Sequence, residues 1–269
     1  MYGYITFLTD FGLQDDFVGV CHGVIKRIAP DVSVLDITHG IPPQAVLQGA
    51  VALANTVPYM PEAVHLAVID PEVGGDRRAI SVRTRDGRVF VGPDNGLLML
   101  AADAAEIDAA HELTNERYRL ERVSRTFHAR DVFAPAAAHL AAGVQLADLG
   151  PPLDPATLVR LPIPTPEVRS AQLHGTVLAV DRFGNVQLNL RREHVSAIGL
   201  RRGDRVELDL GLDAYYAVVA ETFADAAPGE LILYEDSYGA YSIAISGGDA
   251  SALTAAGPGD AVKISSAAV

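Results

Sequence analysis

The chain of 269 residues lacks the features that tie proteins to oxidising compartments, membranes or nucleic acids. Its single cysteine, Cys21, cannot form an internal disulfide. Lys and Arg total 21 against 34 Asp and Glu, and the net charge of -13 argues against a phosphate backbone or an anionic membrane as a bulk partner. The sequence has neither an apolar run of about 18 residues nor a signal-peptide pattern at its N-terminus. We therefore expect a cytoplasmic protein that binds neither nucleic acid nor membranes.

Several familiar site motifs are also missing. The phosphate-binding patterns G-x-G-x-x-G and G-x-x-x-x-G-K-[ST] do not occur, and neither does the G-x-S-x-G motif of a nucleophilic serine. The histidines are scattered and form neither H-x-H nor H-E-x-x-H nor a Cys/His pair. We therefore expect no metal site.

In the first part of the chain, patterns typical of strands alternate with patterns typical of helices. Residues 4–8 are rich in β-branched and aromatic side chains and predict a strand, and residues 14–28 carry apolar side chains at helical spacing. A strand at 33–37, a helix at 45–56 and a buried strand at 64–69 follow. This alternation predicts an α/β domain with a mainly parallel sheet and flanking helices.

Two further segments of this domain have clear local signals. Asp86-Gly87 lies between two strand patterns and predicts a two-residue hairpin turn. An alanine-rich run after Asp131 predicts a helix, with His128 in the loop or first turn before it.

The composition changes after the alanine-rich segment. Six prolines between Pro151 and Pro166 interrupt both helices and strands and indicate a domain boundary. From Gly175 onward, short alternating segments are separated by turn residues, and six or seven strands without helices predict a small barrel or sandwich. We expect an α/β domain at residues 1–162 and an all-β, barrel-like domain at residues 170–269.

The buried strand at 64–69 leads directly into Asp70. Pro71 lacks a backbone N–H, Gly74-Gly75 permit a bend, and Arg77 follows. Ligands of open α/β sheets bind beyond the carboxyl ends of the strands, which makes Asp70 and Arg77 candidate site residues. Taken alone, the stretch is better explained as an Asp-Pro turn with solvated arginines.

Other candidates follow the same logic. Asp10 also ends a strand, and together with Asp70, Arg77 and His128 it forms a set that could orient and activate water or hold an anion. Asp15, by contrast, begins a predicted helix, where a carboxylate complements the helix dipole.

Two turns in the second domain carry polar groups suited to a nucleoside. Asp181, Phe183 and Asn185 could bind ribose hydroxyls, stack on a base and contact its polar edge. Ser237 lies in a similar turn. An ordinary β-turn explains the first set better when it is considered alone, and explains the second equally well.

Six segments occur in a fixed order along the chain: Leu8–Gly12 (LTDFG), Asp36–His39 (DITH), Asp70–Arg78 (DPEVGGDRR), Pro93–Gly96 (PDNG), Phe127–Pro135 (FHARDVFAP) and Asp181–Val186 (DRFGNV). Taken together, they resemble the motifs of the S-adenosyl-L-methionine (SAM) hydroxide adenosyltransferases. This family of adenosine-forming SAM hydrolases is related to fluorinating and chlorinating enzymes. The resemblance implies an α/β domain, a β-barrel-like domain and a homotrimer with active sites between subunits. It also implies hydrolysis of SAM to adenosine and L-methionine without a separate cofactor.

The resemblance assigns roles residue by residue. The catalytic set falls on Asp70, Arg77 and His128. The substrate-binding positions contact the ribose, the base or the methionine part of SAM, and they are Asp10, Asp181, Phe183, Asn185 and Ser237, with Asp15 the weakest match.

The chain departs from the family pattern at two positions. Glu72 and Ala129 stand where the family usually has glycine, and Glu72 adds a carboxylate beside the catalytic set. The halogenating relatives replace the segment at Asp70 with a Tyr-Pro type and lack the catalytic set, so Asp70 favours water as the nucleophile. Two alternatives remain at this stage: a halide-using adenosyltransferase, and a protein that binds adenosine or SAM without turnover.

Overall fold

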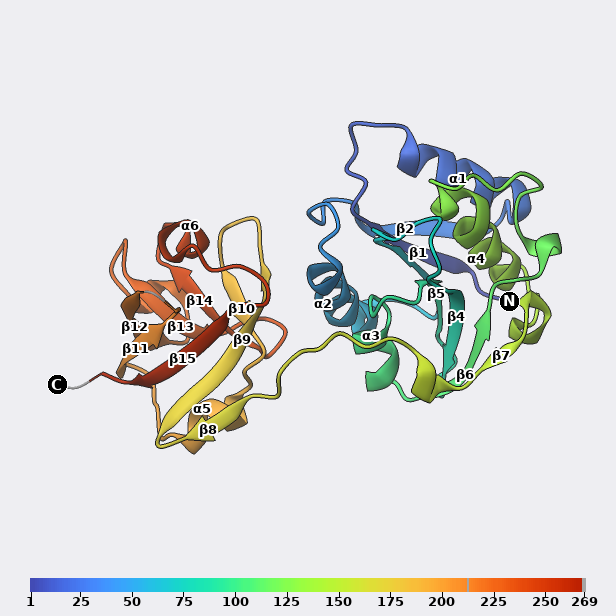
Figure 1. The fold of residues 1–269 in the computed structure, drawn as a ribbon. Helices are drawn as coiled ribbons and strands as arrows, with labels where there is room; N and C mark the ends of the chain where they lie inside the picture. Colours follow the sequence, from blue (N-terminus) through green and yellow to red (C-terminus); the bar gives the residue numbers. More distant parts are fainter. Residues whose placement is uncertain (212, 268–269) are drawn as a thin grey trace. The chain divides into compact units, whose positions relative to one another are not determined.

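The computed structural model describes residues 1–211 and 213–267. The chain divides into two compact units, Met1–Leu161 and Pro162–Val269 (Figure 1). None of the helices among the described residues is long and apolar enough to span a bilayer.

The first unit is built on a seven-stranded sheet with the strand order β2-β1-β3-β5-β4-β6-β7. The four strands β2, β1, β3 and β5 pair in parallel, whereas β4, β6 and β7 continue the sheet in antiparallel fashion. The bounds are β1 Tyr4–Thr9, β2 Ser33–Thr38, β3 Val64–Val68, β4 Ala79–Thr84, β5 Val89–Pro93, β6 Ile107–Glu112 and β7 Pro152–Leu153.

Helices cover both faces of this sheet, and alternation along the strands divides the core in two (Figure 1). On β1, Phe7 packs with α1 (Phe17–Ile28) and α4 (Ala134–Ala141). The next residue, Leu8, packs on the other face with α2 (Val46–Thr56) and α3 (Met99–Ala104). The sheet, whose strands are apolar on both faces, is therefore the middle layer of a three-layer α/β domain.

Short helical turns complete the first unit. A π-helical turn, η3 (Ala129–Phe133), runs directly into α4. The remaining turns are 3-10 helices: η1 Val57–Tyr59, η2 Glu116–Tyr118, η4 Leu146–Leu149 and η5 Pro155–Thr157.

The second unit is a closed β-barrel. Its ring order is β10-β14-β13-β12-β11-β15-β9, and pairing of β9 with β10 closes it, while β8 adds to the edge of β9. All pairs are antiparallel except β12 with β13. The strands are β8 Glu167–Arg169, β9 Gln172–Val180, β10 Val186–Leu188, β11 Arg205–Asp209, β12 Ala214–Ala220, β13 Leu231–Glu235, β14 Tyr241–Ile245 and β15 Ala261–Ser266.

The expected fold class, α/β followed by an all-β barrel, is confirmed. The barrel also has three short helices that the sequence analysis did not predict: α5 Arg192–Ala197, α6 Ala250–Thr254 and η6 Phe223–Asp225. The first helix begins at Phe17 rather than at residue 14, so Asp15 lies ahead of it. The hairpin at Asp86-Gly87 forms between β4 and β5, and Gly87 has a φ of 86°. The Thr84 amide donates to the Arg88 carbonyl over 3.0 Å, so the loop has three residues, 85–87, rather than the two that were predicted.

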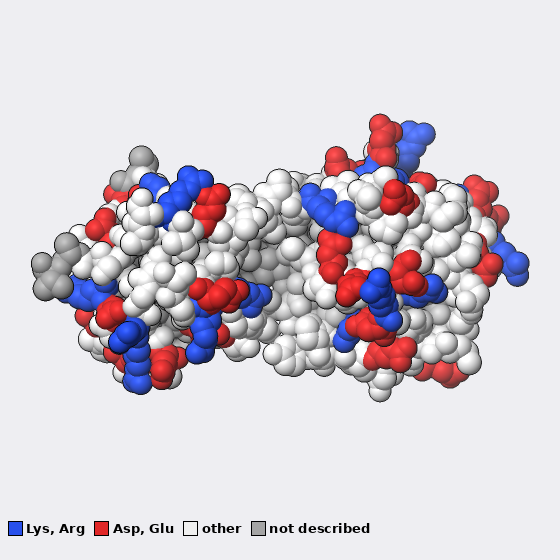
Figure 2. Space-filling view, turned by 90° about the horizontal axis from the view of Figure 1, so that it is seen from below, with Lys and Arg blue, Asp and Glu red and all other residues white. Residues whose placement is uncertain are grey.

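On the face shown in Figure 2, acidic and basic side chains are interspersed in both units. Ion pairs between exposed groups occur in each unit: Arg83 pairs with Asp108 in the first, and Lys263 pairs with Asp209 in the second. The cations on this face therefore lie among acidic groups rather than in a separate basic tract.

Candidate active site

The loop between β3 and β4 carries Asp70 and Arg77 at the carboxyl end of a buried strand. All five residues of β3 are buried, and the chain then turns, with the Val73 amide donating to the Asp70 carbonyl over 3.2 Å. Gly74 has a φ of 81°, and a Cβ at this position would overlap the carbonyl oxygen of Arg125. Glycine therefore lets the loop pack directly against the segment that leads to His128.

Asp70, Arg77 and His128 form one hydrogen-bonded set. Arg77 Nε lies 2.9 Å from Asp70 Oδ1 and 3.1 Å from Oδ2, and Arg77 Nη2 also donates to Oδ2. The same Nη2 lies 2.8 Å from His128 Nδ1. The Asp70 and Arg77 side chains are only 7% and 5% exposed, so water screens their ion pair weakly.

The hydrogen bonding fixes the state of His128. Arginine can only donate, so we infer that His128 Nδ1 accepts and that the proton of the neutral ring is on Nε2. Burial, followed by the nearby Arg77 cation, lowers the pKa of His128 below 6.5. The set therefore offers carboxylate oxygens that accept hydrogen bonds and a neutral imidazole with an N–H donor.

The PDNG segment holds both ends of the Asp70 loop, a role that the sequence analysis missed. Asn95 Nδ2 donates to the carbonyl of Ile69 over 2.8 Å, just before Asp70. Asp94 is 4% exposed and accepts from Arg78 Nε at 2.8 Å, just after Arg77. Sequence alone shows PDNG as a dense turn, and only the fold places it against residues distant in the chain.

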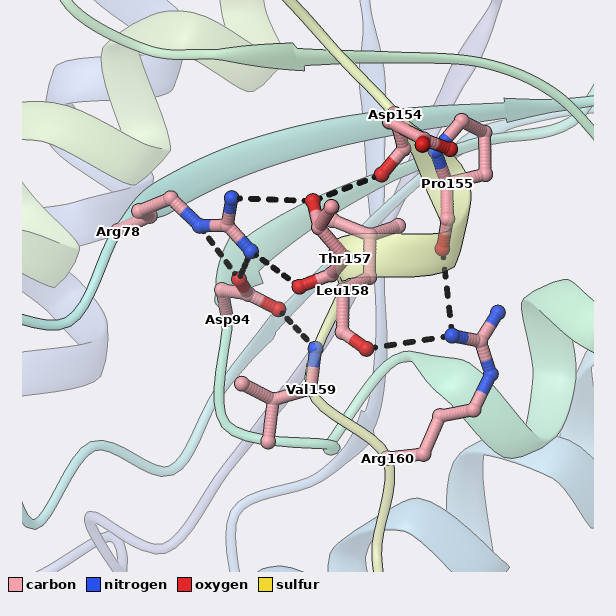
Figure 3. Close-up of polar contacts among 8 residues, drawn as sticks. All are labelled: Arg78, Asp94, Asp154, Pro155, Thr157, Leu158, Val159 and Arg160. Atoms are coloured by element: carbon pink, nitrogen blue, oxygen red, sulfur yellow. Dashed lines mark hydrogen bonds and ion pairs between the residues drawn. The ribbon is translucent and has the colours of Figure 1, made fainter.

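A further anchor fixes Asp94 itself (Figure 3). The Val159 amide donates to Asp94 Oδ1 over 2.9 Å, and Arg78 Nη2 donates to the Thr157 carbonyl over 2.7 Å. An open pocket of about 560 Å³ lies beside this network and is lined by Glu72, Arg77 and Asp94, among others. The departure at Glu72 therefore places an exposed carboxylate on the wall of that pocket.

On the other side of the set, Asp131 orders the segment before His128. Its side chain is fully buried and accepts from the Ser124 amide over 2.7 Å and from Arg130 Nε over 2.6 Å. Ala129, the second position noted as a departure in the sequence analysis, is also buried at the start of the π-helical turn. The tight turn and the ion pair of the buried Asp131 with the partly exposed Arg130 together position His128.

Asp10 follows the carboxyl end of β1, as Asp70 follows that of β3, so both residues lie on the same side of the sheet's strand ends. In the parallel pairing of β1 and β3, Thr9 lies opposite Val68. The Asp10 carboxylate accepts from the Gln44 amide over 2.8 Å. Asp15 is exposed in the loop before α1.

The candidates in the barrel occupy two turns. Asp181 Oδ1 accepts from the amides of Phe183 and Asn185 at 2.8 and 2.9 Å, and Oδ2 accepts from the Asn185 side chain at 2.7 Å. These hydrogen bonds hold Asp181 and Asn185 within the turn. Phe183, between them, is 75% exposed. Ser237 is exposed in the turn between β13 and β14. The structure thus brings Asp70, Arg77 and His128 together, and the barrel candidates form turns within their own unit.

The fold and motif order define the class of the protein. The model of the SAM hydroxide adenosyltransferase N-terminal domain matches residues 5–150, and the model of the corresponding C-terminal domain matches residues 175–263. The chain belongs to the SAM hydroxide adenosyltransferase family.

Particular relatives are similar over nearly the whole chain. An (R)-S-adenosyl-L-methionine hydrolase from Salinispora tropica is 48% identical over 262 residues, 97% of each chain, and one from Thermus thermophilus is 39% identical, over 91% of this chain and 93% of that protein. A fluorinase from Actinopolyspora mzabensis is 28% identical and covers 89% of each chain. The crystal structure of an uncharacterized conserved protein from Thermotoga maritima, 36% identical, superposes with a TM-score of 0.90 over 97% of this chain and 99% of that one.

Proposed function

We propose that this protein hydrolyses SAM to adenosine and L-methionine, with water attacking the ribose C5′ carbon. The observation that carries the proposal is the set of Asp70, Arg77 and His128, held by the hydrogen bonds of Arg77, with the Asp70 and Arg77 side chains buried. The similarity to proteins named SAM hydrolases supports the substrate.

The main requirement of this reaction is a correctly positioned nucleophile. As the C5′–O bond forms, the C5′–S bond breaks, and its electron pair goes to sulfur, which leaves as the neutral thioether of methionine. No general acid is needed, and much of the barrier can be met by holding water in line with the C–S bond. No redox cofactor takes part in this scheme.

The hydrogen-bonding state of the set suggests how the water is held. Asp70 retains acceptor capacity beyond its bonds to Arg77, so the water can donate one proton to it. His128 Nε2–H can donate to the water oxygen, which leaves one lone pair free for C5′. The oxygen becomes strongly acidic as it bonds to carbon, so the weakly basic Asp70 can take the proton at that stage.

We propose further that Asp10, Asp15, Asp181, Phe183, Asn185 and Ser237 bind the substrate, and that the active sites lie between subunits of a homotrimer. The exposed Phe183 ring on the barrel is a surface on which adenine could stack. The assembly is tested by light scattering on the purified chain, which is expected to give about three times its mass of 28.4 kDa. A monomer at enzyme-assay concentration would contradict sites shared between subunits.

A cytoplasmic location is also part of the proposal. Cys21 is buried, and burial raises its thiol pKa to about 12, so the thiol is poorly reactive. A reducing compartment suits a chain whose lone cysteine cannot form an internal disulfide.

The function is tested by incubating the purified protein with SAM in chloride-free buffer and following products by chromatography. Adenosine and methionine in equimolar amounts are expected from the wild type, and none from Asp70→Ala. Intact SAM that remains bound would instead favour a binding protein. Turnover that depends on added chloride would favour halide transfer, the activity class of the fluorinase relatives.

A further inference from the structure

A second cluster of ligand-type side chains lies at the carboxyl end of β2. It is formed by His22 from α1, Asp36 from β2 and His39 from the loop after β2. The two imidazole Nε2 atoms lie 2.9 and 3.1 Å from the same oxygen, Asp36 Oδ1. We propose that this cluster binds a divalent transition-metal ion, zinc by preference.

The buried member of the cluster has an unsatisfied nitrogen. The His39 side chain is 3% exposed, and among the described residues its Nε2 is one of three buried side-chain polar atoms without a hydrogen-bond partner. The approach to Asp36 is short but lacks hydrogen-bond geometry. A buried polar atom without a partner is costly, and a metal ion would accept its lone pair.

The second ring nitrogen of His39, Nδ1, has a hydrogen-bond partner of the kind that orients metal-bound histidines. His39 Nδ1 lies 2.8 Å from the hydroxyl oxygen of Thr9, which is also fully buried. When Nδ1–H donates to that oxygen, the Nε2 lone pair points into the cluster. Metal-ligating histidines almost always have such a partner, because it fixes the ring and its tautomer.

The ligand types and spacing fit zinc better than magnesium or calcium. Two imidazoles and one carboxylate form a nitrogen-rich set, whereas magnesium and calcium prefer oxygen ligands. Bonds of about 2.0–2.1 Å in a tetrahedral site place neighbouring ligand atoms about 3.4 Å apart. The distances from Asp36 Oδ1 to His22 Nε2 and to His39 Nε2, 2.9 and 3.1 Å, therefore need to lengthen by only a few tenths of an ångström.

The cluster is open enough for an ion to enter. The His22 and Asp36 side chains are 32% and 40% exposed, which leaves a coordination position for water. The His39 carbonyl also accepts from the Gly12 amide over 2.7 Å, so an ion bound here would brace the loop that follows β1.

The proposal is tested by zinc titration of the chelator-treated full chain in competition with a chromophoric chelator. We expect one zinc ion per chain, and Co²⁺ is expected to give the visible absorption of a tetrahedral site. His22→Ala and Asp36→Asn are each expected to weaken zinc binding by about 10-fold or more. Losing even a residue that only hydrogen-bonds to a metal ligand typically lowers the affinity by about this factor. His174→Ala, in the barrel, is the matched control and should bind zinc like the wild type.

Thermal unfolding provides a readout independent of enzymatic activity. Zinc should raise the Tm of the wild type and of His174→Ala, because binding to the folded state alone stabilises it. It should not raise the Tm of His22→Ala, whose partly exposed side chain can be removed without opening the core. The proposal is overturned if the wild type binds no zinc, or if His22→Ala and Asp36→Asn both bind it as tightly as the wild type.

Discussion

Arg77 is the side chain through which the other two members of the candidate site are held. It spans both carboxylate oxygens of Asp70 and reaches His128 Nδ1 with the same guanidinium, while its own plane lies over the Phe133 ring at 5.1 Å. A residue that only donates makes its two partners acceptors. It thereby holds the Asp70 carboxylate in place and leaves the His128 proton on Nε2, facing away from Arg77.

The first residue-scale prediction concerns Asp70. Asp70→Asn keeps the shape of the side chain but removes the proton acceptor, so kcat for SAM hydrolysis should fall by about 10²–10⁴-fold. Steady-state kinetics measures the loss. Asp31→Asn is the control, because Asp31 is an exposed carboxylate before β2, at the opposite edge of the sheet, and its kcat should match the wild type.

The second residue-scale prediction concerns the geometry of the cation. Arg77→Lys keeps the charge, but an ammonium group cannot span Asp70 and reach His128 at the same time. We expect kcat to fall by about 10²-fold, the cost of a small misplacement of a catalytic group. A variant with wild-type kcat would show that charge alone is required at this position.

At the scale of elements, the loop from Asp70 to Arg78 is rigid because other segments hold it at three points. Asn95 binds the Ile69 carbonyl before it, Asp94 binds Arg78 at its end, and Gly74 packs on the Arg125 carbonyl in its middle. Asp70 and Arg77, two of the three proposed catalytic residues, therefore belong to a loop whose backbone is fixed by distant parts of the same unit.

Gly74→Ala tests the middle contact. The added methyl group would overlap the Arg125 carbonyl, and the φ of 81° adds backbone strain, so we expect about a 10-fold or larger loss of kcat. Gly87→Ala is a matched control: its φ is 86°, but the nearest atom to an added Cβ is 3.7 Å away. Equal losses of kcat in both variants would mean that backbone strain, and not the contact with Arg125, is responsible.

The sequence predicted these elements to different degrees. Periodicity located the strands and helices around Asp70, because those signals are local. The hairpin at Asp86-Gly87 was predicted in the right place, but its loop is one residue longer than predicted. The support from Asp94 and Asn95 could not be derived, since it depends on pairing of β3 with β5 and on the chain crossing near Val159. In the His22 cluster, Asp36 and His39 lie three residues apart in the DITH segment, but His22 comes from α1, so no spacing rule could have joined all three.

At the scale of the whole molecule, each unit has its own core, and the first unit buries a titratable group in it. His65 on β3 is fully buried, with Nδ1 2.8 Å from the Thr6 hydroxyl oxygen and its ring 5.0 Å from that of Phe90. Burial lowers the pKa of His65 from 6.5 to about 4. The folded protein therefore holds this imidazole neutral at pH values where an unfolded chain would protonate it.

Stability should therefore fall on acidification. Between pH 6.5 and about pH 4 the unfolded state takes up a proton at His65 that the folded state does not. The contribution of neutral His65 to the free energy of unfolding is therefore complete above pH 6.5 and is lost as the pH falls towards 4. The total loss is about 3 kcal/mol. Urea unfolding at a series of pH values measures it. His65→Gln lacks the titrating group and should lose less free energy of unfolding over this window. The same pH dependence in both proteins would contradict the assignment.

The central claim is that water attacks C5′ of SAM at the Asp70 set, and oxygen labelling tests it most directly. The purified protein is incubated with SAM in ¹⁸O-enriched water, and the products are analysed by mass spectrometry. The account predicts one ¹⁸O atom in the 5′-hydroxyl of adenosine and none incorporated into methionine. Asp70→Asn should form the labelled adenosine more slowly, by about 10²-fold or more. Unlabelled adenosine, or ¹⁸O in a product cleaved at another carbon of the sulfonium, would contradict it.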